Sequence, residues 1–276
     1  MKLAVMSYTL SRSVSADQFD IPAMCRLAQE LGIDGIDMVS TYGRKAADLR
    51  KIVDDHGLKT ICHTFMADLN VTDTAALQAG LDVVRQGIEN AVVLGTDKVM
   101  AVTPGKVGVA RDKTRRNFVR GLQQALPWAQ AAGITLTVEN FPGADSPFVI
   151  AADFKAALND LPELKLTFDS GNVFTGGEDQ ADSFRQCAKQ VVHSHFKDWD
   201  VVTEGGRISG LDGRSYSAAL IGEGTMAPLH GRVLDAMREA GYSGYIDMEY
   251  EGHKYPADEA TRLIARYLRS LAKELK

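Results

Sequence analysis

One local pattern recurs along this chain: an amphipathic helical run, then a glycine, then a short β-rich run that ends in polar side chains. It is seen in the segments LAQELGIDGIDM, VDDHGLKTICHT, VVLGTDKVMAVT, AQAAGITLTVEN and MREAGYSGYIDMEYE. Each joint glycine stands where the C-terminus of a helix needs a residue that tolerates a positive φ. These glycines are Gly32, Gly57, Gly95, Gly133 and Gly241. With no hairpin signal such as Asn-Gly between alternating runs, the joints predict alternating strands and helices in parallel βαβ units.

Counting outward from these joints gives eight strands. They lie near residues 3–7, 34–38, 59–63, 97–102, 134–139, 164–169, 191–195 and 245–249. Helices fill the intervals, for example Asp17 to Leu31 and Val109 to Ala132. No Pro/Ser-rich linker divides the 276 residues, and a barrel of eight βα units takes about 250 residues around one core. We therefore predict a single (β/α)8 TIM barrel over residues 1–276. A doubly wound sheet is the less favoured alternative, because no G-x-G-x-x-G follows the first strand.

The interval 199–226 departs from this rhythm. It reads WDVVTEGGRISGLDGRSYSAALIGEGTM, which is glycine-rich and too long for an ordinary connection. Loops of this length are uncommon unless they are functional. We predict a lid or substrate-specificity loop after the seventh strand, with a short extended piece at Ala218–Ile221. A solvated insertion is the alternative.

Charge and cysteine usage exclude several classes of protein. The formal net charge of −5 argues against a general nucleic-acid-binding surface, which is normally basic. Cys25, Cys62 and Cys187 are far apart, so neither a disulfide framework nor a cysteine zinc site is expected, and a reducing compartment is favoured. The N-terminal run MKLAVMSYTL is broken too early for a secretory signal, and no stretch approaches the roughly 20 apolar residues of a membrane span. We predict a cytoplasmic protein with no nucleic-acid or membrane partner.

Ionisable side chains end four of the later predicted strands. Side chains alternate along a strand, so in ITLTVEN the apolar residues share the face toward the helices, and the threonines and Glu139 share the face toward the barrel axis. The same alternation turns an ionisable residue toward the barrel axis at the end of each of the next three strands. The four residues are Glu139, Asp169, His195 and Glu249. Because active sites of barrels lie at the C-terminal ends of the strands, we expect these side chains to meet there.

Three carboxylates at one end of one barrel need a counter-charge. They repel one another and raise each other's pKa unless a cation neutralises them, and burying them unpaired costs several kcal/mol each. A divalent metal ion meets this need. Mostly oxygen donors with one imidazole suit Mn²⁺, Mg²⁺ or Co²⁺ and also permit Zn²⁺. We predict one catalytic metal ion with open positions for substrate, with Mn²⁺ favoured.

Several motifs together point to a known family. The segments TVENFPG, TFDSGN, VHSHFKDWD, IGEGTM and GYSGYIDMEYEG resemble the signatures of the xylose isomerase-like TIM barrels, described as sugar phosphate isomerases and epimerases. That family includes ketose 3-epimerases, hydroxypyruvate isomerase and inosose dehydratase, with endonuclease IV a distant relative. The resemblance covers nearly the whole chain, and it is specific for the fold and the metal site rather than for the substrate.

The resemblance implies a ligand set and a mechanism. It assigns the metal to Glu139, Asp169, His195 and Glu249, and it makes Glu139 and Glu249 the catalytic acid/base pair as well. A glutamate removes the proton α to a carbonyl of an acyclic sugar, and a proton returns through a metal-stabilised enediolate. Return to the opposite face epimerises the substrate, and return to the neighbouring carbon isomerises it. We expect such an isomerase or epimerase of a small sugar or polyol; the alternative is a metal-dependent dehydratase of a keto-inositol or similar polyol.

Two positions depart from the ketose epimerases. Asn172 stands where they carry a histidine three residues after the aspartate, and Val201 stands where they place an arginine. The HFKD run is more like the inosose dehydratase branch, with Lys197 in reach of substrate oxygens. Asn172 also occupies one of the extra histidine positions of endonuclease IV, which, with the acidic charge balance, disfavours phosphodiester hydrolysis on DNA.

Further residues are expected around the metal. His63, Lys197 and Asn172 are predicted to contact substrate, and His193 and Glu251 to support the ligands from behind. Plain structural roles are the alternatives: a rim histidine for His63, an ion pair with Asp198 for Lys197, and a solvated carboxylate for Glu251. Outside enzymes, the rival is a catalytically silent sugar-binding or structural subunit. Related barrels commonly form dimers or tetramers, so a homodimer or homotetramer is also considered.

Overall fold

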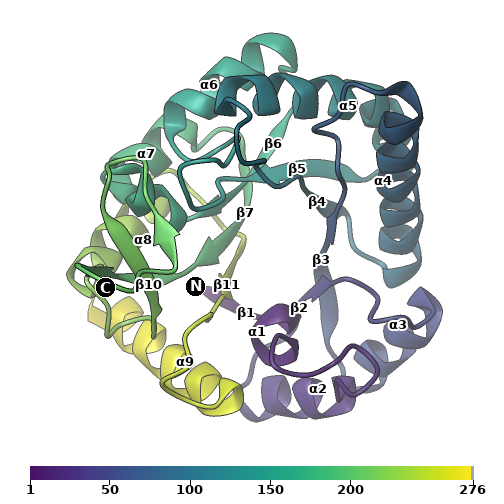
Figure 1. Ribbon diagram of the computed structural model, residues 1–276. Helices are drawn as coiled ribbons and strands as arrows, with labels where there is room; N and C mark the ends of the chain where they lie inside the picture. Colours follow the sequence, from purple (N-terminus) through teal and green to yellow (C-terminus); the bar gives the residue numbers. More distant parts are fainter. Residues whose placement is uncertain (275–276) are drawn as a thin grey trace.

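Eight parallel strands close into a barrel surrounded by helices in the computed structural model, which describes residues 1–274 (Figure 1). The order around the barrel is β1-β11-β7-β6-β5-β4-β3-β2. The strands are β1 (Lys2–Met6), β2 (Gly35–Val39), β3 (Lys59–Met66), β4 (Lys98–Val102), β5 (Thr135–Glu139), β6 (Lys165–Asp169), β7 (Val191–Phe196) and β11 (Tyr245–Met248). This is a TIM barrel, as predicted, and each strand lies where the helix–glycine–strand joints placed it.

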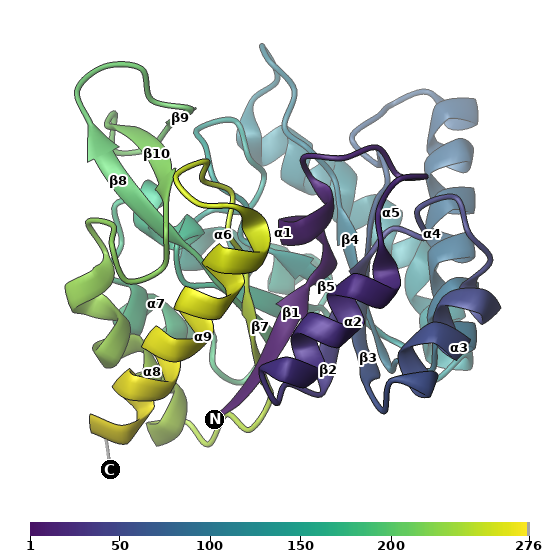
Figure 2. The ribbon, with the colours of Figure 1, turned by 90° about the horizontal axis from the view of Figure 1, so that it is seen from below.

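The longer helices cover the outside of the barrel, whereas the short first helix follows β1 directly and lies at the C-terminal end of the barrel (Figure 1 and Figure 2). In chain order the helices are α1 (Ser7–Ser11), α2 (Ile21–Glu30), α3 (Ala46–Asp55), α4 (Thr74–Leu94), α5 (Arg111–Ala131), α6 (Ala151–Asp160), α7 (Gln180–Cys187), α8 (His230–Glu239) and α9 (Ala257–Glu274), with 3-10 helices η1 (Asn172–Gly176) and η2 (Ala227–Leu229). Helix α2 begins later than the predicted Asp17 because the Asp20 side chain accepts the Ala23 N–H and a proline follows at the start of the helix. No helix of the described residues has the length and apolar character that crossing a membrane requires.

The glycine joints have the predicted conformation. The five joint glycines have φ between +60° and +77°. At Gly95 the backbone N–H bonds back to the Ala91 carbonyl and so ends α4 in a left-handed residue. Glycine therefore turns each of these chain segments from helix into strand.

The strands separate an apolar layer from a polar interior. Leu136 and Val138 of β5 are buried in the core shared with the helices. Between them Thr137 points inward, and its Oγ1 lies 2.8 Å from Thr167 Oγ1 of β6. Because the barrel interior holds polar side chains, charged groups further along the same strands can be kept there.

Residues 198–219, within the segment predicted to be a lid or substrate-specificity loop, form a second small sheet. Strands β8 (Asp198–Val202), β10 (Ser215–Ala219) and β9 (Ile208–Ser209) pair antiparallel in that order. The extended piece expected at Ala218–Ile221 therefore begins earlier and ends earlier. Asp-Gly at 212–213, with φ of +79° at Gly213, turns the chain between β9 and β10 and is a hairpin signal that the sequence reading missed. Figure 2 shows this sheet projecting beyond the C-terminal ends of the barrel strands.

Candidate metal centre

The four predicted ligands lie together at the C-terminal end of the barrel. Each offers one donor atom, and these atoms all lie within 4.8 Å of one another. Glu139 ends β5, Asp169 ends β6, His195 lies on β7 and Glu249 follows β11 directly. His195 Nδ1 lies 2.8 Å from Glu139 Oε1 and 3.4 Å from Glu249 Oε2. All four side chains are buried. Alternation along each strand turns them toward the barrel axis, where residues from distant parts of the sequence meet.

Unpaired oxygens at this centre fit a cation. Asp169 Oδ1 accepts the backbone N–H groups of Gly171 and Asn172, each at 2.7 Å, which fixes the carboxylate. Asp169 Oδ2 and Glu249 Oε2 are buried without a hydrogen-bond donor among the described residues. Burial, reinforced by repulsion from the neighbouring glutamates, raises the pKa of Asp169 well above its ordinary value. Buried oxygens of this kind are costly unless a positive charge reaches them, and this donor set could hold a divalent ion.

Lys197 brings a positive charge to the edge of the centre. Its Nζ lies 2.8 Å from Glu249 Oε1, 2.9 Å from Glu251 Oε1 and 3.8 Å from Asp169 Oδ2. The alternative partner, Asp198, is not used: its carboxylate accepts backbone N–H groups of Trp199, Gly222, Gly224 and Met226 instead. Asp198 thus ties the second sheet to the barrel, and Lys197 stays within the acidic centre.

The two glutamates of the centre have different environments. Burial raises the pKa of Glu139 above its ordinary value despite His195. Burial acts on Glu249 too, but Lys197 and His195 outweigh it and hold the pKa of Glu249 below its ordinary value. Glu251, predicted to lie behind the ligands, is buried and bridges Lys197 to Arg207, whose guanidinium pairs with its second oxygen. The solvated alternative for Glu251 therefore does not describe this structure.

The predicted substrate residues differ in their surroundings. Asn172 is buried beside Asp169, and neither atom of its side-chain amide has a hydrogen-bond partner among the described residues. His63 on β3 is buried, with Nδ1 2.8 Å from the Met38 carbonyl, and burial lowers its pKa. Within the described chain no hydrogen bond or ion pair joins His63 to the four clustered residues.

A second layer of ionisable residues lies deeper in the barrel. Asp37, His193, His195 and Asp247 also offer donor atoms within 4.8 Å of one another, and all four are buried. His193 was predicted to lie here. Asp37 was not predicted, because the alternation of side chains was applied only to the later strands. The signal was present: Asp37 stands between two buried apolar residues in the strand GIDMV, so alternation turns it inward.

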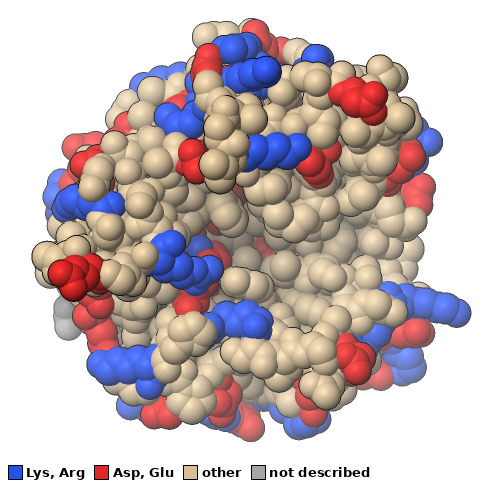
Figure 3. Space-filling model, viewed as in Figure 1, with Lys and Arg blue, Asp and Glu red and all other residues tan. Residues whose placement is uncertain are grey.

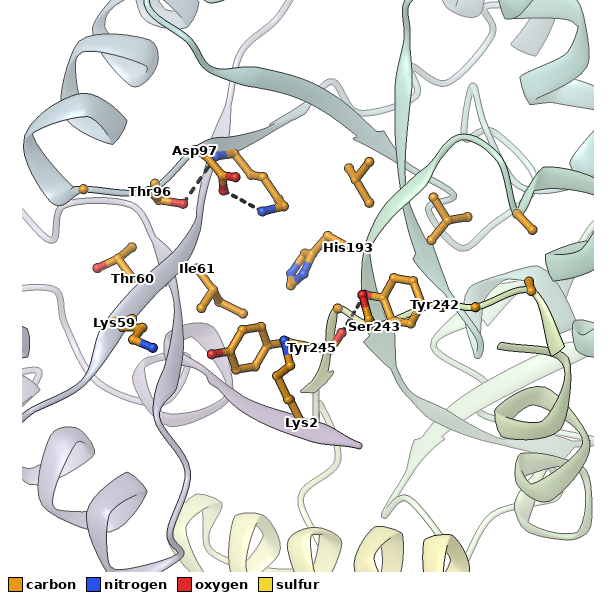
Figure 4. Close-up of a pocket in the computed structure, with 18 residues that line it drawn as sticks. Lys2, Lys59, Thr60, Ile61, Thr96, Asp97, His193, Tyr242, Ser243 and Tyr245 are labelled. Carbon is orange, nitrogen blue, oxygen red and sulfur yellow. Dashed lines mark hydrogen bonds and ion pairs between the residues drawn. The ribbon is translucent and has the colours of Figure 1, made fainter. Parts of the chain in front are cut away.

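The two ends of the barrel carry different surfaces. Figure 3 views the C-terminal face, which is hollowed at its centre, with acidic atoms inside the hollow. A cavity of about 650 Å³ lies at the opposite end, where the strands begin, and its lining includes Lys2, Lys59, Lys98 and His193. Figure 4 shows His193 pointing into this second cavity. The acidic centre is therefore reached from the C-terminal face, the usual place of barrel active sites.

Fold and centre together define a TIM barrel with a buried cluster of acids and one histidine at the C-terminal ends of its strands. The chain belongs to the xylose isomerase-like TIM barrel family, whose sequence model matches residues 25–271. No curated protein matches the sequence significantly.

Solved structures share the fold over almost their full lengths. The IOLI protein with a bound zinc atom is 17% identical, with a TM-score of 0.81 over 100% of this chain and 99% of that one. An L-ribulose 3-epimerase is 17% identical, with a TM-score of 0.76 over 99% and 97%. The probable 3-DHS dehydratase AsbF from Bacillus anthracis is 16% identical, with a TM-score of 0.76 over 98% and 99%. At these identities the likeness concerns the fold, which hosts epimerases and a probable dehydratase alike.

Proposed function

We propose that this protein is a divalent-metal-dependent isomerase or epimerase of a small sugar or sugar derivative. The observation that carries the proposal is the convergence of Glu139, Asp169, His195 and Glu249, with two buried carboxylate oxygens that have no hydrogen-bond donor in the part of the chain that the structure describes. Such a donor set is suited to a cation that also contacts substrate. The zinc atom in the structurally similar IOLI protein supports the same assignment.

The four clustered side chains would hold one divalent ion, with Mn²⁺ favoured and Mg²⁺, Co²⁺ or Zn²⁺ as alternatives. When bound, such an ion supplies Lewis-acid polarisation of a carbonyl and offsets negative charge that develops beside it. His195 contributes Nδ1, the ring nitrogen that faces the glutamates.

Glu139 and Glu249 act as the acid/base pair. One carboxylate removes the proton α to a substrate carbonyl, and the other, or the same one, returns a proton to carbon. Lys197 holds Glu249 through its 2.8 Å ion pair and donates hydrogen bonds to substrate oxygens. Asn172, whose side-chain amide has no hydrogen-bond partner among the residues described, and His63 are proposed to contact the remaining substrate hydroxyls. We propose small-molecule substrates, because the chain carries a net charge of −5 and a nucleic-acid surface is normally basic.

A dehydratase at the same centre is the second candidate. It is favoured by Lys197, whose buried ammonium lies beside Glu249 and Glu251 and so places a proton donor where a departing hydroxyl needs one. The probable 3-DHS dehydratase among the similar structures supports this alternative. It uses the same ligands and differs only in the fate of the β-hydroxyl.

Two measurements test the proposal. Elemental analysis of the purified protein should find about one divalent ion per chain, lost in Glu249→Gln and retained in Glu223→Gln, whose carboxylate pairs with exposed Lys254. Incubation with a panel of ketoses in D₂O should give deuterium at the α carbon without loss of water. A new enone or diketone absorbance would establish the dehydratase instead. Absence of metal, or two to three ions per chain, would contradict the proposed function.

A further inference from the structure

Asp37 is the most heavily hydrogen-bonded carboxylate in the layer beneath the centre. It is fully buried on β2. Thr64 donates its hydroxyl to Asp37 Oδ1 at 3.1 Å. Two histidine nitrogens lie near Oδ2: His193 Nε2 at 3.1 Å and His195 Nε2 at 3.3 Å. Asp37 therefore faces one hydroxyl donor from β3 and two imidazole nitrogens from β7, all at hydrogen-bond distance.

His195 joins this carboxylate to the metal centre through its two ring nitrogens. Nδ1 faces Glu139 and Glu249, whereas Nε2 faces Asp37. A neutral imidazole has one N–H and one lone pair, and only the nitrogen with the lone pair can bind a metal ion. If Nδ1 gives its lone pair to a metal ion, the proton of the neutral ring lies on Nε2, where the Asp37 carboxylate accepts its hydrogen bond.

We propose that Asp37 is a positioning residue that fixes His195 in the tautomer able to bind a metal through Nδ1. The inference rests on the proposed function, because it requires a metal ion at the C-terminal centre. Carboxylates that orient a ligating histidine typically change metal affinity by about 10–100-fold when they are removed. Asp37 comes from the second strand of the barrel, far in sequence from the four proposed ligands.

Asp247 is a matched control in the same layer. It is as buried as Asp37, but its Oδ2 lies 3.8 Å from His195 Nε2 and 3.9 Å from His193 Nε2, beyond hydrogen-bond range. Both its oxygens lack a donor among the described residues. The two aspartates thus lie equally buried in the same layer, and of the two only Asp37 lies within hydrogen-bond distance of the histidines.

A second cation is the rival occupant of this deeper layer. The donor atoms of Asp37, His193, His195 and Asp247 are close enough to surround one. Such an ion would take the lone pair of His195 Nε2, so that nitrogen could not carry a proton. The protonation state of Nε2 therefore separates the two arrangements. Both histidine nitrogens already lie at hydrogen-bond distance from Asp37 Oδ2, at 3.1 and 3.3 Å, which favours the proton.

The experiment uses Co²⁺ as the probe on the full chain. Titration calorimetry compares wild type, Asp37→Asn and Asp247→Asn, and proton NMR of the Co²⁺-loaded wild type looks for a strongly shifted, solvent-exchangeable N–H of the ligating histidine. We expect this signal in wild type. In Asp37→Asn an amide N–H can face Nε2 and stabilise the wrong tautomer, so Co²⁺ affinity should fall about 10–100-fold. In Asp247→Asn the fall should stay below about 10-fold, because the Asp247 carboxylate lies 3.8 Å from His195 Nε2 and is not hydrogen-bonded to it.

Three results would overturn the assignment: unchanged affinity in Asp37→Asn, equal losses in both variants, or a loaded wild type with two ions per chain and no exchangeable histidine N–H. The NMR signal needs no variant, so a misfolded Asp37→Asn protein does not remove the test. A wild type that binds no Co²⁺ at all contradicts the proposed function itself, which distinguishes that failure from a failure of the positioning role.

Discussion

Lys197 is a buried ammonium among carboxylates, and its removal exposes their mutual repulsion. Its side chain is 1% exposed. Burial lowers the pKa of Lys197, but Glu249 and Glu251 outweigh this and raise it well above its ordinary value. Breaking a buried ion pair by removing one partner typically costs about 3–5 kcal/mol, because the other charge is left uncompensated. The lysine is therefore expected to stabilise the barrel when no metal ion is bound.

We predict that Lys197→Met lowers the free energy of unfolding in chelator by about 3–5 kcal/mol. Added Mn²⁺ should stabilise the variant more than it stabilises wild type, because the cation then supplies the missing positive charge. Urea unfolding with EDTA and with Mn²⁺ measures both effects. Lys155→Met, which removes an exposed lysine bonded to Gln186, is the control and should stay within about 0.5 kcal/mol. An equal response of Lys197→Met and wild type to Mn²⁺ would argue against the metal centre.

His230, at the start of α8, makes the free energy of unfolding depend on pH. It is buried against Phe196 and Tyr267, and burial lowers its pKa to about 4. Its ordinary pKa is 6.5, so the unfolded chain binds the proton more tightly than the folded protein does. The contribution of neutral His230 to the free energy of unfolding is therefore present above pH 6.5 and is lost as the pH falls toward 4. At about 1.4 kcal/mol per pKa unit, roughly 2 kcal/mol should be lost between pH 7 and pH 5.

His230→Gln should remove most of this loss, which urea unfolding at the two pH values would measure. Asp198 Oδ2 lies 3.8 Å from His230 Nε2, and burial raises the pKa of Asp198 to about 6. Ionisation of Asp198 disfavours the folded state, so the contribution of Asp198 to the free energy of unfolding increases as the pH falls. This contribution is expected in both wild type and variant. The difference between the two proteins therefore isolates the histidine. Equal losses in both would show that His230 is already protonated in the folded protein at pH 5.

Among the elements, the turn from β6 into η1 sets the metal centre against β7. A Cβ at Gly171 would lie 2.7 Å from both Lys197 Cβ and the Lys197 carbonyl oxygen. The φ of Gly171 is −81°, so the constraint is close packing rather than backbone strain. The same residue donates its N–H to Asp169 Oδ1. Any side chain here moves a proposed ligand and a proposed substrate contact together.

Gly171→Ala should therefore destabilise the protein by about 1–3 kcal/mol, the usual cost of overpacking, and weaken Mn²⁺ binding. Thermal unfolding and calorimetry would measure the two effects. The control is Gly231→Ala in α8, where the nearest atom to the added Cβ is Leu271 Cδ1 at 3.8 Å. That substitution should be neutral or stabilising by about 0.5–1 kcal/mol, because alanine favours helix. Similar losses in both variants would show that the Gly171 contact is not what limits substitution.

Sequence patterns predicted the barrel elements well because each depends on local chemistry. The joint glycines fixed where helices end, and alternation fixed which side chains turn inward, so Glu139 and Asp169 could be placed by counting. In the second sheet, Asp-Gly at 212–213 marks the turn between β9 and β10, but no local pattern indicates that β8 pairs with β10 across the intervening chain. Alternation along a strand also predicts the face on which a side chain lies, but it does not predict which residues of other strands that side chain contacts. The partners of Lys197 and the contact between Asp37 and His195 therefore became visible only in three dimensions.

At the scale of the whole molecule, ionisable side chains occupy the barrel interior from its C-terminal to its N-terminal end, beside a small apolar cluster of Cys62, Met100 and Val102. The acidic cluster lies at the C-terminal end, Asp37 and Asp247 lie beneath it, and His193 reaches the cavity at the N-terminal end (Figure 4). The apolar core lies outside the strands, between the barrel and its helices. Stability from that outer core is what allows the interior to hold unpaired charge. A ligand of the interior should therefore stabilise the entire fold.

Metal binding should raise the stability of the whole barrel by linkage. An ion at 100 times its Kd adds about 2.7 kcal/mol, which is roughly 5–10 °C in Tm for a chain of this size. We expect this rise on adding Mn²⁺ to chelator-treated wild type and its absence in Asp169→Asn. In chelator the variant should be at least as stable as wild type, because Asp169 Oδ2 has no hydrogen-bond donor within residues 1–274 and an amide adds no charge. Asp112→Asn, at an exposed pair with Arg116, should respond like wild type. A full Mn²⁺ response in Asp169→Asn would remove Asp169 from the ligand set.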